Sequence, residues 1–151
     1  MGYTTENTVW PAHPIPSSIQ HLIERFYVLA DLNSPEAGDR LAEEVFAEEA
    51  TLMGVGSKFT GSQEIRRSRD NAWRVIETRR HEILKAYVAD LEGRDVMLIG
   101  KVQMGLRNGK TVDSEFTARM VVDEASDESG SPRLSYSQVW ADMGTLAAAL
   151  K

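Results

Sequence analysis

The stretch KVQMGLRNGKTVDSEFTARMVVD, residues 101–123, decides the fold class. Apolar and polar side chains alternate in its second half, which is the period of a β-strand with two different faces. The dipeptide Asn108-Gly109 interrupts the pattern and favours a tight hairpin with a type I′ turn. The stretch therefore predicts two long antiparallel strands, at 95–107 and 111–123.

The same period continues on both sides of this hairpin. Residues 79–89 and 133–141 are strand-like runs, separated from it by the turn sequences LEG and EASDESGSP. Two shorter runs, TLMGVG and SKFTG, are expected to pair through a turn at Gly56-Ser57. Most of the chain after residue 79 is therefore predicted to form one antiparallel sheet.

Three helices are predicted in the N-terminal half. The first begins at a capping box formed by Ser17 and Gln20 and carries apolar side chains at helical spacing to about Asp31. The second follows Ser34 as its N-cap, and the third runs from Ser62 to about Ile76. Leu41, Val45 and Phe46 supply the buried face of the second helix.

Three prolines make residues 1–16 an extended arm, and residues 17–151 are predicted to form one α+β domain. In this architecture the helices cover one face of a curved antiparallel sheet. A chain of 151 residues is long enough to bury a single core without stabilising cross-links. It contains no cysteine, which excludes disulfides and thiolate chemistry.

Hydropathy and net charge also limit which kinds of partner the protein is expected to bind. No apolar run approaches the ~20 residues that a transmembrane helix needs, and the N-terminus lacks the basic start and apolar segment of a secretory signal. A net charge of -6 argues against nucleic acid as a partner. We expect a cytoplasmic protein with no membrane and no nucleic-acid partner.

Arginines gather in RRSRDNAWRVIETRRHEI, residues 66–83, which holds six of the twelve in the chain. A helical wheel places Arg69 beside the apolar positions and places Arg67 and Arg74 on the opposite side. Most of the cluster is therefore a solvated face. Arg69 has two interpretations: an ion pair with a carboxylate of the sheet, or a stabiliser of an oxyanion, since a guanidinium keeps its charge when partly desolvated.

Motifs for phosphate, nucleophile and metal chemistry are absent from the sequence, so cofactor-free general acid/base chemistry remains. His81, at the start of the first long strand, is either a structural side chain or an acid/base group facing the interior. Glu64, in the first turn of the third helix, either complements the helix N-terminus or adds a carboxylate near a cavity.

Four sequence segments between about residues 18 and 150 indicate the fold by their order and spacing: FAEEATL, FTGSQEIRRSR, RRHEI and YSQVWADMGTLAAAL. Together they resemble the SnoaL-like polyketide cyclases and isomerases of the nuclear-transport-factor-like superfamily. The second segment also resembles fungal meroterpenoid and polyketide isomerases. The resemblance implies a cone-shaped α+β fold whose curved sheet surrounds a pocket.

The resemblance also implies candidate site residues. VWADMG is similar to the closing motif of the SnoaL-like proteins, in which an aspartate, here Asp142, is the acid/base catalyst; a strand-end cap is the competing interpretation. The resemblance implies that Glu115 and Arg119 are pocket residues on the concave face of the sheet. The competing interpretation is that they belong to a solvated face. The ketosteroid isomerase machinery is absent, because Phe26, Gly54 and Thr117 stand at its three positions.

The aromatic and sulfur side chains suggest an apolar ligand, although core packing is the alternative. The residues expected to line the cone are Phe26, Tyr27, Met53, Phe59, Trp73, Met104 and Trp140. Apolar walls with a few convergent polar groups are the usual form of a small-molecule site.

The sequence thus predicts a cofactor-independent isomerase or cyclase acting on a polyketide or meroterpenoid intermediate of secondary metabolism. His81, Glu115 and Asp142 are the acid/base candidates, with Arg69 or Arg119 stabilising an enolate. The alternatives are a non-catalytic small-molecule carrier and a dimeric interaction protein of the same fold. Apolar residues on the long strands favour a homodimer.

Overall fold

The computed structural model describes residues 3–151. Its elements, in chain order, are α1 Ser17–Ala30, α2 Ala37–Arg40, the π-helical turn η1 Leu41–Val45, β1 Phe46–Gly54, β2 Ser57–Thr60, α3 Gly61–Arg67, β3 Ile76–Val88, β4 Asp95–Leu106, β5 Thr111–Val122, α4 Glu124–Glu128, β6 Leu134–Ala141 and α5 Gly144–Ala149.

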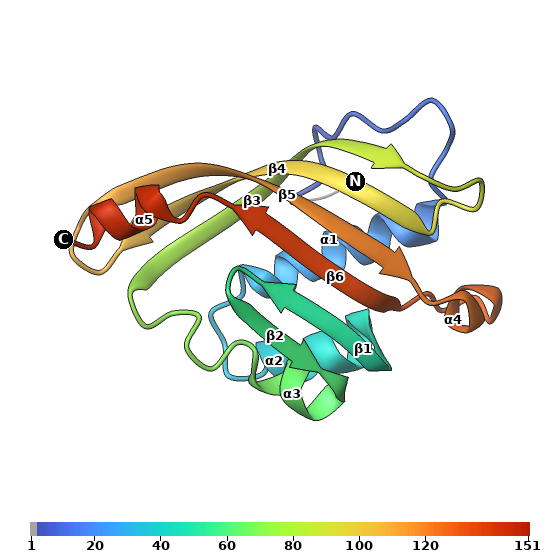
Figure 1. The fold of residues 1–151 in the computed structure, drawn as a ribbon, viewed down its shortest axis with the longest axis horizontal. Helices are drawn as coiled ribbons and strands as arrows, with labels where there is room; N and C mark the ends of the chain where they lie inside the picture. The colour runs from blue at the N-terminus through green and yellow to red at the C-terminus, as the bar shows by residue number, and fades with distance from the viewer. Residues whose placement is uncertain (1–2) are drawn as a thin grey trace.

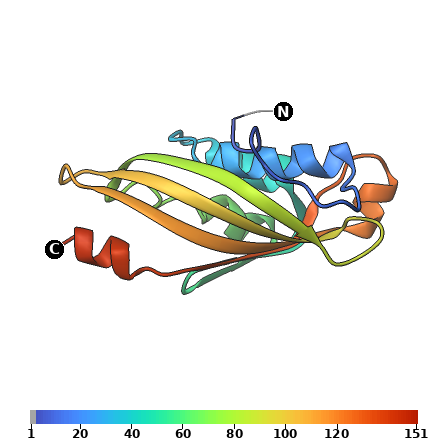
Figure 2. The ribbon, with the colours of Figure 1, turned by 90° about the horizontal axis from the view of Figure 1, so that it is seen from above.

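The strands form one curved sheet in the order β2-β1-β6-β5-β4-β3 (Figure 1). Every neighbouring pair is antiparallel except β1 and β6, which run parallel. The helices of the N-terminal half lie on one side of the sheet, and α4 and α5 lie at its two ends (Figure 2). The predicted α+β fold class is confirmed.

The core lies between α1 and the long strands. Ile19, Ile23 and Leu29 on the apolar stripe of α1 are buried with Ile83 of β3 and Leu98 of β4. The predicted capping box at the start of α1 is wrong. Pro16 precedes the helix without a side-chain cap, and the Gln20 Nε2 donates instead to the Ile15 carbonyl at 3.0 Å.

The central hairpin is confirmed, but its turn differs from the prediction. Gly109 has a positive φ of 86°, whereas no residue other than glycine does among those described. The Gly109 N–H donates to the Leu106 carbonyl at 2.9 Å, and the Leu106 N–H donates to the Lys110 carbonyl at 2.8 Å. These bonds describe a type I turn followed by a left-handed glycine, a common longer hairpin connection.

The short hairpin also forms, with its turn at Val55-Gly56 and not at Gly56-Ser57, because Gly54 pairs with Ser57. At its other end, β1 begins at Phe46, a residue that was predicted to belong to the second helix. The predicted helix is replaced by α2 and the π-helical turn η1.

The third helix is much shorter than predicted. It ends at Arg67, and Ile76, its expected last residue, begins β3. The Ser68 hydroxyl donates to the Ile65 carbonyl at 2.6 Å, and residues 68–75 continue as turns. Serine, aspartate and asparagine in this segment favour turns because their side chains compete for backbone hydrogen bonds.

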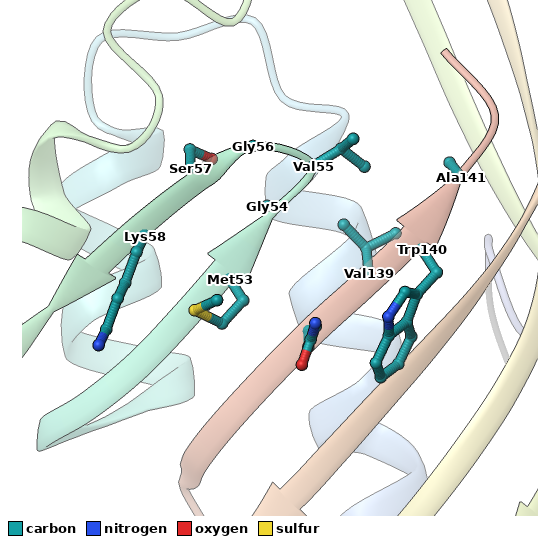
Figure 3. A pocket seen from close by; sticks show the side chains of 10 residues that line it. Met53, Gly54, Val55, Gly56, Ser57, Lys58, Val139, Trp140 and Ala141 are labelled. Carbon is teal, nitrogen blue, oxygen red and sulfur yellow. The ribbon is translucent and has the colours of Figure 1, made fainter.

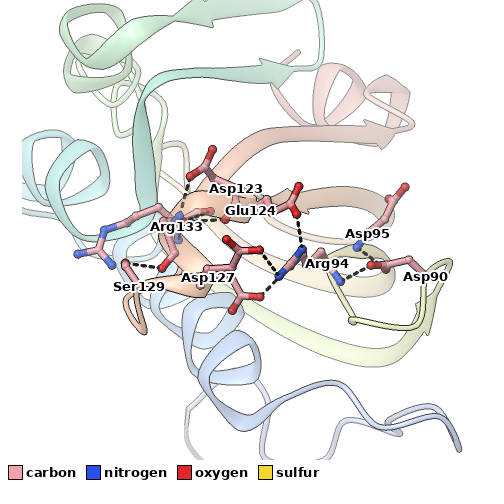
Figure 4. A network of polar contacts seen from close by, with 10 residues as sticks. Asp90, Arg94, Asp95, Asp123, Glu124, Asp127, Ser129 and Arg133 are labelled. Carbon is pink, nitrogen blue, oxygen red and sulfur yellow. Dashed lines mark hydrogen bonds and ion pairs between the residues drawn. The ribbon is translucent and has the colours of Figure 1, made fainter.

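Two helices were not predicted. In α4, the Asp123 carboxylate caps the helix by accepting the Ser126 N–H at 2.9 Å. In α5, the N–H of Gly144 donates to the Asp142 carboxylate at 2.8 Å. A polar cluster fastens α4 to the loop between β3 and β4 (Figure 4). Arg94 is its centre, with Asp127 at 2.8 Å and Glu124 at 3.5 Å.

The described part of the arm lies against α1 and β3; its residues 1–2 are outside the described residues. Val9 makes a parallel bridge to Lys85, and Thr4 and Thr5 are buried. The division into one arm and one domain stays a prediction, as does the homodimer. No helix in residues 3–151 is long and apolar enough to cross a membrane.

Candidate active site

A cavity of about 340 Å³ lies between α1 and the sheet. Its walls come from all the main elements: α1, the β1–β2 hairpin, the segment after α3, and strands β3 to β6. Most of the lining side chains are apolar, including Phe26, Leu52, Phe59, Val102, Met104 and Val139. The volume is within the range of small-molecule sites, which runs from about 300 to 1,000 Å³.

A second hollow, of about 460 Å³, adjoins this cavity between the β1–β2 hairpin and β6 (Figure 3). It exists because β1 and β6 pair with each other only as far as Met53 and Gln138, beyond which the two strands separate. Lys58 and Trp140 line it on the outside. Met53 and Val139 line both hollows, so the strand ends form a shared wall.

Two polar residues from distant parts of the chain meet beside the inner cavity. Asp31 follows the last residue of α1, and His81 is on β3. The His81 Nδ1 lies 2.5 Å from the Asp31 Oδ1, and the His81 backbone N–H donates to the Asp31 Oδ2 at 2.8 Å. The Asp31 side chain is only 4% exposed, and that of His81 is 17% exposed.

This geometry determines which nitrogen of His81 can act as a base. An ionised carboxylate only accepts hydrogen bonds, so the proton of the neutral ring is on Nδ1. Within residues 3–151, no group makes a hydrogen bond to the Nε2. The imidazole lines the cavity, and its unprotonated Nε2 is the ring nitrogen available to a ligand there.

Two aromatic rings hold the imidazole in place. The ring centroid of Tyr27 is 5.1 Å from that of His81, and the centroid of Phe116 is 5.5 Å away. Burial, together with the negative charge of Asp31, raises the pKa of the Tyr27 hydroxyl above its ordinary value. Tyr27 therefore stays protonated and can act only as a neutral donor or acceptor.

Two arginines add positive charge to the cavity wall. The Arg69 Nη2 donates to the Ala30 carbonyl at 2.5 Å, while its buried Nε has no partner among the described residues. Burial and the nearby charge of Arg79 lower the pKa of Arg69 to about 10, so it remains charged at neutral pH. The Arg79 guanidinium lies 5.0 Å from the centre of the Trp73 ring and donates to the Ala72 carbonyl at 3.2 Å.

The structure brings several predicted site residues together. Those that line the cavity are His81, Arg69, Phe26, Tyr27, Met53, Phe59 and Met104. Arg69 reaches it from the turn after α3, not from the helical face on which the prediction relied. Its alternative interpretation, an ion pair, is wrong, because no described carboxylate lies within 4.0 Å of it.

The predicted placement of Glu115 and Arg119 in the pocket is wrong. Both are exposed on the outer face of β5, where Arg119 makes two hydrogen bonds to Asp95, at 2.9 and 2.8 Å. Successive side chains of a strand point to opposite faces. Phe116 and Ala118 are the residues of β5 that line the cavity.

Four other predicted residues also lie away from the cavity. Glu64 is exposed on α3, and Asp142 is exposed just after β6, where its carboxylate accepts the Gly144 N–H. Trp140 is 45% exposed and lines only the outer hollow. Trp73 packs instead in a satellite cluster with Ile76 and neighbouring side chains.

Sequence reasoning missed Asp31 and Arg79. A carboxylate at the C-terminal end of a helix opposes the helix dipole, and this placement of Asp31 was an available signal. Arg79 lies two residues before His81, so the alternation of β3 puts both on one face. Residues 3–151 contain no cluster of three or more His, Asp or Glu side chains arranged for a metal ion.

Comparison with known proteins identifies the fold. No protein-family model and no curated protein matches the chain. Among solved structures, a hypothetical protein with a ketosteroid isomerase-like fold from Catenulispora acidiphila, in complex with trimethylamine, is 16% identical with a TM-score of 0.69. The match covers 90% of this chain and 93% of that one. The chain has the NTF2-like fold.

Other NTF2-like structures carry enzyme names. A candidate SnoaL-like polyketide cyclase from Shewanella denitrificans is 14% identical over 89% of this chain and 97% of its own, with a TM-score of 0.66. A candidate scytalone dehydratase from Novosphingobium aromaticivorans is 11% identical over 84% and 83%, with a TM-score of 0.62. At such identities the likeness concerns the fold, which has members named as cyclases, isomerases and dehydratases.

Proposed function

We propose that the chain is a cofactor-independent isomerase or cyclase that works by general acid/base catalysis at the inner cavity. The observation that carries the proposal is the hydrogen-bonded pair of Asp31 and His81 beside an apolar cavity. A base oriented by a buried carboxylate is a recurrent catalytic arrangement, because the carboxylate fixes the tautomer and stabilises the imidazolium that forms.

The first step transfers a proton from the carbon next to a substrate carbonyl to the Nε2 of His81. The electron pair of the broken C–H bond moves into an enolate, whose oxygen needs a donor. Arg69, charged and lining the cavity, provides one, and the protonated hydroxyl of Tyr27 provides another. Asp31 remains ionised and stabilises the new charge of His81.

The second step returns the proton, so that no external reagent is consumed. In an isomerisation, the enolate is protonated by His81 at another carbon. In a ring closure, the enolate carbon attacks a second carbonyl of the same molecule, and His81 protonates the resulting alkoxide. We propose a polyketide or meroterpenoid-type intermediate as substrate, which the sequence resemblance and the apolar cavity walls support.

Exchange of α-protons for deuterium tests this proposal without knowledge of the natural substrate. 2-Tetralone, an apolar bicyclic ketone with acidic α-protons, is incubated in D₂O with the protein and followed by NMR. We expect exchange above the buffer rate, and a reduction of on the order of 10²- to 10⁴-fold in His81→Gln, the usual contribution of a positioned base. Asp31→Asn should also lose at least ~10²-fold, because an amide can hold the ring in the wrong tautomer.

Glu115→Gln and Asp142→Asn are the matched controls, since both remove a carboxylate that lies outside the cavity. We expect both to exchange at the wild-type rate. Undiminished exchange in a folded His81→Gln variant would contradict the proposal. Binding of 2-tetralone with exchange no faster than in buffer would favour the small-molecule carrier.

A further inference from the structure

Charges around the cavity do not balance. Arg69 and Arg79 both line it, and among residues 3–151 the only carboxylate whose charge acts on either of them is Asp31, which is hydrogen-bonded to His81. No ion pair within 4.0 Å joins either arginine to a described acidic side chain. With a neutral His81, the four groups carry one uncompensated positive charge, and buried charges without partners are costly.

The proposed reaction leaves Arg79 without a role. Proton transfer uses His81 and Asp31, and the enolate oxygen needs only Arg69 or Tyr27. Arg79 is nevertheless held in a defined position by the face of Trp73 and by the Ala72 carbonyl. This contact occupies one of its five N–H donors, and the planar guanidinium suits a carboxylate that binds through two oxygens.

Arg79 and His81 reach the cavity from nearby positions on one face of β3. The two residues are two positions apart along the strand, so their Cα atoms lie about 6.6 Å apart at 3.3 Å per residue. One small molecule can therefore contact both side chains. Ile76, Met104 and Leu146 line the same cavity and offer only apolar surface to the rest of a ligand.

We propose that the cavity binds a ring-containing, mostly apolar carboxylate, with its carboxylate on Arg79 and its acidic carbon at the Nε2 of His81. This inference rests on the proposed function in one respect, because it takes the cavity to be the substrate site. The cavity volume of about 340 Å³ has room for a small ring system.

The charge requirement can be measured by binding alone. 2-Naphthoate and 2-naphthamide have nearly the same shape, and only the first is an anion. Isothermal titration of the wild-type protein should show that 2-naphthoate binds about ten- to a hundred-fold more tightly, the contribution expected of a charge-assisted hydrogen bond. In Arg79→Gln this preference should fall to within about two- to three-fold, while 2-naphthamide binds as in the wild type.

Arg80→Gln is the matched control. Arg80 is the next residue of β3 but is exposed on the other face, where its guanidinium lies over the ring of Tyr3 at 4.5 Å. This variant should retain the full preference for 2-naphthoate. Equal affinity of the wild-type protein for the two ligands, or an undiminished preference in Arg79→Gln, would overturn the inference. So would a failure of 2-naphthoate to bind at millimolar concentration.

The titration tests the carboxylate inference, and the exchange experiment tests the catalytic proposal, so either can fail without the other. The exchange experiment uses a neutral ketone and depends on His81, whereas the titration uses unreactive ligands and depends on Arg79. Exchange without a preference for the anion would remove the carboxylate inference and leave the catalytic proposal. The reverse result would indicate a carrier of organic acids.

Discussion

At the residue scale, the site contains a carboxylate that ordinary local preferences disfavour. Asp31 follows α1 at its C-terminal end, where the helix dipole opposes a negative charge by about 0.3–1 kcal/mol. Arg69 contributes the opposite charge at the same helix end through its hydrogen bond to the Ala30 carbonyl. Such violations of local rules are expected where a residue is retained for function.

Gly100 determines how closely Phe116 approaches the sheet, and through it the imidazole. A methyl group on Gly100 would lie 2.3 Å from the Phe116 Cζ and 3.0 Å from the Glu82 carbonyl oxygen. Gly100→Ala should therefore displace the Phe116 ring and lower the free energy of unfolding by about 1–3 kcal/mol, as overpacking of a core does. Urea denaturation measures the change.

A double variant separates this clash from other effects of the alanine. Gly100→Ala combined with Phe116→Leu should lose less stability than the sum of the two single variants, because the smaller side chain removes the overlap. If Gly100→Ala is as stable as the wild type, the close contact of Phe116 with Gly100 is not present in solution.

A cavity residue could be predicted from the sequence only where local periodicity shows which face of a helix or strand it occupies. Phe26, on the apolar stripe of α1, could be identified in this way. Asp31 could not, because its partner His81 is 50 residues away and only the packing of α1 on β3 brings them together. Glu115 was assigned to the wrong face, since an alternating strand identifies two faces without saying which one meets the helices.

At the element scale, α1 connects the cavity to the arm. Tyr27 faces the cavity, and Glu24 of the same helix binds the arm. The Glu24 carboxylate accepts the N–H groups and hydroxyls of Thr4 and Thr5 at distances from 2.6 to 3.1 Å. The arm is thus attached to the helix by one ionisable side chain.

This attachment should depend on pH. Burial opposes the shift, but the hydrogen bonds from Thr4 and Thr5 prevail and hold the pKa of Glu24 below its ordinary value. A carboxyl with a lowered folded-state pKa contributes stability that is complete above its unfolded value, about 4.3, and is lost as the pH falls through the folded value. We expect hydrogen-exchange protection of the Thr4 and Thr5 amides to decline below about pH 4.

Glu24→Gln is the control for this titration. An amide cannot ionise, so the protection of both threonine amides should be weaker at neutral pH and should no longer change between neutral and acidic pH. Protection in the wild type that is unchanged down to about pH 3 would show that Glu24 does not hold the arm by its charge.

Elements differed in how well the sequence predicted them. The four long strands were placed to within three residues at each end, because strand-like runs bounded by turn residues mark their positions. The end of α3 was misplaced, because the apolar spacing of Ile65, Ala72 and Ile76 fits a helix although the chain leaves it after Arg67. The small α4 begins at a single capping carboxylate, which an apolar pattern does not reveal.

At the scale of the whole molecule, charge is distributed unevenly. The chain carries a net charge of -6, yet two arginines line the cavity, and the carboxylate beside it, Asp31, is bound to His81. The order of helices and strands was enough to predict the α+β fold. It was not enough to predict the cavity chemistry, because structures of this fold at 11–16% identity place different side chains on the same scaffold.

The central claim is that Asp31 holds the proton of neutral His81 on Nδ1 and leaves Nε2 free as the base. Nitrogen-15 NMR of the His81 ring measures this directly, at an alkaline pH where the ring is neutral. The account predicts a protonated Nδ1 and an unprotonated Nε2 in the wild-type protein, with the Nδ1 preference reduced in Asp31→Asn. A wild-type ring that carries its proton on Nε2 would contradict the account.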